Sequence, residues 1–198
     1  MVEKLIFKFL ETIDVQTCVV NNQLMAFKGD IENTIVWYCD KKLHRFIIEE
    51  CHRQDRKEVY SSHSKTKAEI MFCAVVDNFF NRTIDITVQQ QLKLLLQNNN
   101  FEAVERVLAR SLKIDSYSLN EIKEDKVSLL LNSEVADLYF GEEKILSEIS
   151  LLRGYMSLYN YSKKIERGKE VYQELISKNN DEVSLSEFLK IYITSSSY

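Results

Sequence analysis

The chain contains no proline and only four glycines in 198 residues. Glycine-rich phosphate loops need several glycines at short fixed spacing, and these four are far apart: Gly29, Gly141, Gly154 and Gly168. Neither the GxGxxG nor the GxxxxGK[ST] pattern is present, and the GxSxG turn of serine hydrolases is also missing. The sequence therefore excludes these nucleotide-binding and hydrolase classes. Because glycine and proline are the residues that most often form tight turns, their scarcity favours helices joined by polar loops.

Long hydrophobic runs are absent as well. No apolar stretch approaches the roughly 18 residues that a membrane-spanning helix needs. Residues 1–13 carry Glu3 and Glu11 and no small-residue cleavage site, which is typical of an amphipathic helix and not of a signal peptide. We therefore expect a cytoplasmic, globular protein with no membrane partner.

The cysteines show no metal-binding or disulfide pattern. All four precede residue 74 and none forms a CxxC pair: Cys18, Cys39, Cys51 and Cys73. We interpret them as reduced thiols that pack as small hydrophobic side chains. A zinc site is the alternative, but its candidate ligands match no usual spacing: Cys39, Cys51, His52 and His63. The sequence predicts no metal site and no cofactor.

The N-terminal third reads as a small antiparallel β-meander. Apolar residues at helical spacing predict a first helix over residues 4–13. Asn21 and Asn22 tolerate left-handed backbone angles and predict a hairpin between residues 17–20 and 23–27. Further strands are expected at residues 34–39, 43–50 and 57–61.

From Ser64 onward the hydrophobic period becomes helical. Ser64 is a candidate N-cap, and Ser184 with Glu187 forms a capping box that predicts the last helix. Helices are expected over these ranges: 68–80, 88–96, 101–112, 129–140 (closed by Gly141), 145–159 and 166–178. The predicted fold class is α+β, with a small N-terminal antiparallel β-meander packed on a predominantly α-helical C-terminal bundle. Residues 1–82 would form the meander with flanking helices and residues 83–198 the helical region, packed as one continuous domain.

Negative charge is concentrated late in the chain. The net charge is −4, and residues 117–150 hold eight acids against the three lysines Lys123, Lys126 and Lys144. A solvated helical face is one explanation. The other is a surface that attracts a basic partner, such as a nucleic-acid-cutting enzyme, and this surface argues against nucleic-acid binding by the chain itself. The predicted partner-binding residues are Glu121, Glu124, Asp125, Glu134, Asp137, Glu142 and Glu143.

No catalytic pattern stands out. Cys51 and His52 are adjacent, as are Glu49 and Glu50, so on a strand the members of each pair point to opposite faces. A nucleophilic pair or a paired-carboxylate site would need a partner from elsewhere in the fold. We expect a non-enzymatic protein. A Cys51- or Glu49-dependent enzyme is the alternative, and thiol labelling distinguishes the two.

The block from Thr34 to Phe80 carries a resemblance to a known group of proteins. A strand with Trp37 and Tyr38 is followed by the apolar run 46–48, then by Glu49 and Glu50, a polar connector and the apolar helix 68–80. This order resembles immunity proteins of bacterial polymorphic toxin systems, including those of contact-dependent growth inhibition. Where such families show Glu-Arg-Gly, this chain has glutamate, cysteine and histidine at positions 50–52.

The resemblance implies a cytoplasmic protein that binds and neutralises one cognate toxin C-terminal domain by occluding it. The acidic segment agrees with a basic toxin, for example a nuclease. The alternative is a helical adaptor that holds a peptide or a subunit, for which an apolar groove and salt-insensitive binding would be expected.

Overall fold

The computed structural model describes residues 2–53, 55–81, 84–176 and 182–195. Contacts within the chain divide it into two compact units. Unit 1 comprises residues 1–82 and 168–198, and unit 2 comprises residues 83–167. The helix α5 (Leu151–Ile176) contributes its earlier part to unit 2 and its later part to unit 1. Both units combine helices with a sheet, which confirms the α+β class.

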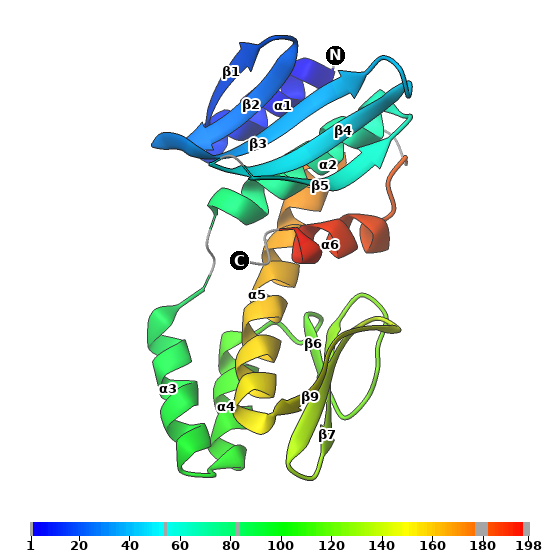
Figure 1. Cartoon of the computed structure of the whole chain (residues 1–198). Coiled ribbons are helices and arrows are strands. Elements are labelled where there is room, and N and C mark those ends of the chain that lie inside the picture. Colours follow the sequence, from blue (N-terminus) through cyan, green and yellow to red (C-terminus); the bar gives the residue numbers. More distant parts are fainter. Residues whose placement is uncertain (1, 54, 82–83, 177–181, 196–198) are drawn as a thin grey trace. The chain divides into compact units, whose positions relative to one another are not determined.

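Unit 1 contains a five-stranded antiparallel sheet whose strands follow chain order, as predicted. Its strands are β1 (Gln16–Val20), β2 (Gln23–Lys28), β3 (Asp30–Asp40), β4 (Arg45–His52) and β5 (Asp55–Ser62). Its helices, besides the end of α5, are α1 (Val2–Thr12), α2 (Lys65–Phe80) and α6 (Leu185–Thr194). Figure 1 shows α1 and α2 against the same side of this sheet.

The turns of this sheet follow from local sequence. Asn21 and Asn22 have φ of 51° and 63°, so the β1–β2 hairpin closes through a two-residue turn with both central residues left-handed, and Val20 pairs with Gln23. At the β3–β4 turn the Asp40 carboxylate accepts the backbone N–H of Lys42 at 2.8 Å. The predicted Asn-Asn hairpin is confirmed.

The helix α2 forms the centre of the unit 1 core. Ser64 caps it by accepting the Lys67 N–H at 3.2 Å, which confirms the predicted N-cap, and its residues from Ala68 to Asn78 are buried. The helix α6 packs against α2 through buried polar contacts: the Tyr192 hydroxyl donates to the carboxyl group of Asp77, and Asn78 donates to Ser195.

Unit 2 contains a four-stranded mixed sheet. Its strands are β6 (Tyr117–Leu119), β7 (Val127–Asn132), β8 (Val135–Phe140) and β9 (Glu143–Ser150), with β6 parallel to β7 and the rest antiparallel. Its helices, besides the start of α5, are α3 (Ile86–Gln97) and α4 (Phe101–Ser111). At Gly154 a β-carbon would stand 3.0 Å from Cβ of Ala136, so glycine allows α5 to approach β8 closely.

The predicted helix over residues 129–140 is wrong, because β7 and β8 form a hairpin there. Leucine-rich runs have good helix propensity, but cross-strand pairing of Leu129 with Leu138 buries both side chains completely. Gly141, with φ of 53°, belongs to the β8–β9 turn and does not cap a helix. Residues 143–150 are strand β9, so the predominantly helical C-terminal bundle is matched only in part.

Candidate functional site

The seven acidic residues predicted to bind a partner lie on strands and connections of unit 2. Glu121, Glu124 and Asp125 lie in the β6–β7 connection, and Glu134 lies in the β7–β8 turn. Asp137 lies within β8, whereas Glu142 and Glu143 lie at the β8–β9 turn and the start of β9. Glu134 and Asp137 were expected within a helix over residues 129–140, where the structure has the β7–β8 hairpin instead.

Strand register brings part of this set together. Val127, Phe140 and Glu143 are consecutive partners across β7, β8 and β9, so the end of the β6–β7 connection and the β8–β9 turn lie at the same end of the sheet. The Gly141 N–H donates to the Lys126 carbonyl at 3.4 Å and joins the two segments. We call the exposed residues there, Glu124, Glu142 and Glu143, the acidic end of unit 2.

The lysines near this end are engaged elsewhere. Lys126 Nζ donates to the Ile114 carbonyl at 2.7 Å, and Lys144 Nζ donates to Asp137 at 2.9 Å while lying 5.3 Å from the centre of the Tyr139 ring. Glu124 and Glu142 make no hydrogen bond or ion pair with any residue that the structure describes. Their charges therefore remain uncompensated by direct contacts.

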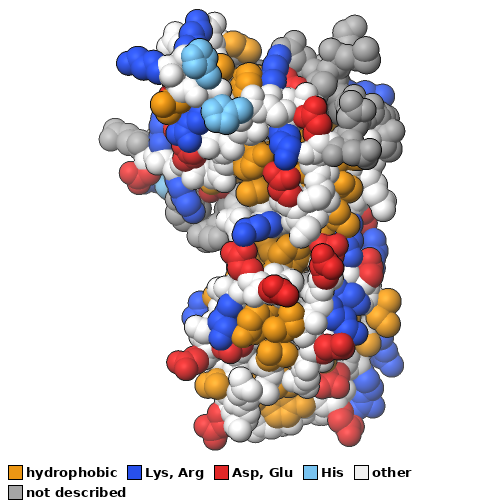
Figure 2. Space-filling model, turned by 90° about the vertical axis from the view of Figure 1, so that its right-hand side faces the viewer, with side chains coloured by type: hydrophobic (Ala, Val, Ile, Leu, Met, Phe, Trp, Pro, Cys, Tyr) orange, Lys and Arg blue, Asp and Glu red, His pale blue; other side chains and the backbone are white. Residues whose placement is uncertain are grey.

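The other predicted positions stand apart from the acidic end. Glu134 lies at the opposite end of β7 and β8, and Glu121 pairs with Lys123 at 2.8 Å. The hydrogen bond from Lys144, followed by that from the Glu148 N–H, lowers the pKa of Asp137 below its usual value. On the face drawn in Figure 2, acidic, basic and apolar side chains are interspersed, with no continuous patch of one charge sign.

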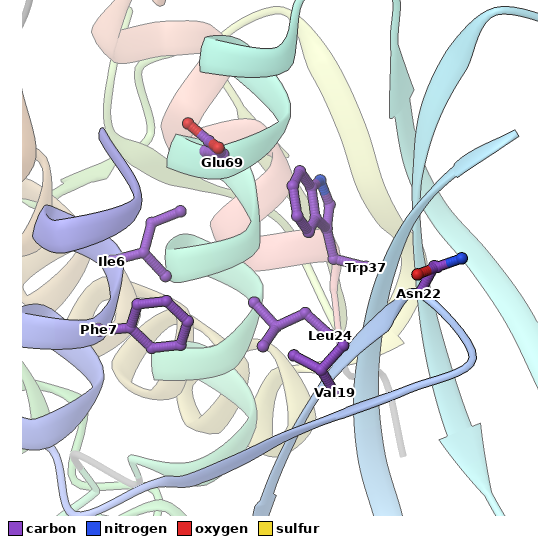
Figure 3. A pocket seen from close by; sticks show the side chains of 7 residues that line it. All are labelled: Ile6, Phe7, Val19, Asn22, Leu24, Trp37 and Glu69. Carbon is purple, nitrogen blue, oxygen red and sulfur yellow. The ribbon is translucent and has the colours of Figure 1, made fainter. Parts of the chain in front are cut away.

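Unit 1 contains a pocket that the sequence did not predict. It has a volume of about 230 Å³ and lies between the helix-facing side of the sheet and the helices α1 and α2 (Figure 3). Its lining is apolar apart from one amide and one carboxylate: Ile6, Phe7, Val19, Asn22, Leu24, Trp37 and Glu69. The available signal was Glu69, a carboxylate set between Ala68 and Ile70 at the start of the apolar stretch of α2.

Packed aromatic rings form the inner wall of the pocket, and its rim is exposed to solvent. Trp37 stacks on Phe46 with ring centres 5.8 Å apart and leans against Phe72 of α2 at 6.5 Å. Phe7 and Val19, by contrast, are 40% and 67% exposed. The pocket therefore opens between α1 and the β1–β2 hairpin.

The one carboxylate of the pocket forms an ion pair with a lysine of the same helix. Glu69 is only 2% exposed, and Lys65, one turn earlier on α2, lies 3.4 Å from its Oε1 atom. The same ammonium group lies 6.0 Å from the centre of the Trp37 ring. A buried carboxylate needs such a partner, because removal from water disfavours its charge.

The cysteine and glutamate of the enzyme alternative have structural contacts. Burial raises the pKa of the Cys51 thiol, which disfavours the thiolate that a nucleophile requires. The Glu49 carboxylate accepts the Tyr38 hydroxyl at 3.0 Å and lies 3.4 Å from Arg56. The ring of His63 contacts a backbone carbonyl at 2.9 Å.

Among the residues that the structure describes, no three histidine, cysteine, aspartate or glutamate side chains lie close enough to hold a metal ion. Within the same residues, no helix combines the length and the apolar character that crossing a bilayer would require. In comparisons with known proteins, the chain matches no family model, no curated protein and no solved structure.

Proposed function

We propose that the chain is a non-enzymatic protein that binds a cognate toxin domain, basic in character, and neutralises it by covering it. The acidic end of unit 2 is the observation that supports this proposal most directly. Glu124 and Glu142 are exposed there without counter-ions among the described residues, while the neighbouring lysines contact other groups. A nuclease is a fitting target, because an enzyme that holds phosphates presents a basic surface.

The acidic end would act mainly on the rate of encounter. Complementary charges steer two proteins together and favour one partner over others, whereas exposed ion pairs add little affinity once formed. Because the Debye length is about 8 Å at physiological ionic strength, this steering weakens as salt is added.

Charge reversal tests the proposal. A variant with Glu124→Lys, Glu142→Lys and Glu143→Lys should associate with the partner about tenfold more slowly at low salt, in keeping with electrostatic steering. Its remaining rate should depend little on salt, because the attractive field is gone. Circular dichroism should show an unchanged fold, since two of the three residues are exposed turn or loop positions and the third begins β9.

A matched control keeps the overall charge change equal. Glu11→Lys, Asp55→Lys and Glu105→Lys reverse three exposed acids elsewhere in the chain. The control should associate at nearly the wild-type rate. Equal slowing of both variants would assign the effect to net charge alone, and a wild-type rate for the first variant would refute the role of the acidic end.

A further inference from the structure

The edge strand β1 differs from the other sheet edges in the described residues. The opposite edge, β5, carries the exposed charges Arg56, Lys57 and Glu58 and a register shift against β4. In unit 2, β6 has only three residues, and β9 carries Glu143 and Lys144 and is bulged against β8. Short length, charge and bulges are devices that prevent an edge from pairing with another strand.

The strand β1 has none of these devices. Its sequence from Gln16 to Val20 holds no charge, no proline and no glycine, and its pairing with β2 is regular. Val19 and Val20 are 67% and 47% exposed. No described residue pairs with its outer edge, which leaves a row of backbone donors and acceptors open.

The pocket opens beside this edge. Val19 belongs both to β1 and to the pocket lining. It pairs with Leu24 of β2, which pairs with Trp37 of β3, and all three side chains line the pocket from the same side of the sheet. A strand added to β1 would place alternate side chains on this side, next to Val19. An apolar cavity of roughly 150 Å³ is enough to bind benzene, so a pocket of about 230 Å³ accommodates an aromatic or long aliphatic side chain.

We propose that the β1 edge binds an extended segment of a partner protein as an additional strand, with one large apolar side chain of that segment inserted into the pocket. Main-chain hydrogen bonds would supply affinity and the pocket would supply selectivity. This site lies in unit 1 and does not depend on the acidic end of unit 2.

Two features define the chemistry of the segment. A second copy of β1 fits poorly, because Gln16–Val20 contains only glutamine, threonine, cysteine and valine, none of which fills the pocket. The charge nearest to the start of the edge is Asp14, whose side chain is 96% exposed and lies 3.9 Å from Lys28. Because Lys28 already offsets this carboxylate, the segment needs no charge of its own: it is an uncharged β-forming run with an aromatic or long aliphatic anchor.

A displayed library of random ten-residue peptides, selected against the full chain, tests this inference. Peptides that also bind the Val19→Lys variant are then removed from the selected pool. This variant places a charge on the edge of β1 at an exposed position. The expected survivors share one large apolar residue flanked by β-branched ones and bind Val19→Lys at least tenfold more weakly. Trp37 is the only tryptophan and lines the pocket, so its fluorescence should change on binding of each synthesised peptide.

Two controls separate the outcomes. Ile114→Lys changes an apolar residue that is 86% exposed in unit 2 and should leave peptide binding unchanged. Replacing the anchor of a selected peptide by alanine should abolish the Trp37 response. Survivors without a common apolar anchor, or no peptide that distinguishes wild type from Val19→Lys, would overturn the proposal. Concentration-dependent dimerisation that Val19→Lys abolishes would assign the edge to a second copy and overturn it as well.

Discussion

Replacing Tyr192 with phenylalanine should destabilise unit 1 measurably. The Tyr192 hydroxyl donates to the carboxyl group of Asp77, and both residues are essentially inaccessible to solvent. Loss of a donor to a buried acceptor costs about 1–3 kcal/mol. Asn81 also donates to this carboxyl group at 3.0 Å, so part of its hydrogen-bonding capacity remains satisfied and we expect about 2 kcal/mol. For a chain of this size that corresponds to a fall in Tm of roughly 4–8 °C.

Urea unfolding followed by Trp37 fluorescence is the appropriate assay, because this single tryptophan lies in unit 1. The matched control is Tyr172→Phe, which removes a hydroxyl that donates to the Val183 carbonyl at 2.9 Å in a partly exposed position. A bond of that kind contributes about 1 kcal/mol or less. If Tyr192→Phe lowers the free energy of unfolding by no more than Tyr172→Phe does, the buried hydrogen bond between α2 and α6 does not stabilise unit 1.

Three further predictions concern packing, reactivity and pH. At Gly168 a new β-carbon would stand 2.8 Å from the buried Leu189 of α6. Gly168→Ala should therefore lower the free energy of unfolding in urea by about 1 kcal/mol, because overpacking a core costs about 1–3 kcal/mol and outweighs the roughly 1 kcal/mol gain in helix propensity. Burial raises the pKa of the Cys73 thiol, so iodoacetamide at pH 8 should label the exposed Cys39 and leave Cys73 unmodified until the chain unfolds. Lys144→Met should raise the pKa of Asp137 toward its ordinary value in a ¹³C NMR titration, and a titration curve that does not move would refute the assigned contact. Because the folded pKa of Asp137 is lowered, its stabilising contribution is present above the unfolded value near roughly 3.9 and is lost as pH falls through the folded pKa.

Local signals in the sequence predicted the elements that local chemistry specifies. Asn21 and Asn22 form the left-handed turn expected of them, and Ser64 and Ser184 cap α2 and α6. The helix predicted over residues 129–140 is wrong because the local sequence there favours a helix and a strand about equally. Pairing with β9, whose residues were also expected to be helical, decides the outcome, and that pairing is not visible in any short window.

The candidate sites depend on the same nonlocal information. Composition identified Glu124, Glu142 and Glu143, but only the register of β7, β8 and β9 places them at one end of a sheet and separates them from Glu134. The pocket joins α1, three strands and α2, so no spacing along the chain indicates it. The partner-binding role of the acidic residues stays a prediction.

The most direct test of the proposed function is a tagged pull-down from the native host, washed at increasing salt, with mass spectrometry of the retained proteins. Each candidate partner is then expressed with and without this chain. We predict a single stoichiometric partner that is basic, arrests growth when expressed alone and becomes harmless when this chain is co-expressed. A chain that retains no such partner, or that fails to relieve the toxicity of the partner it retains, would contradict the proposed function.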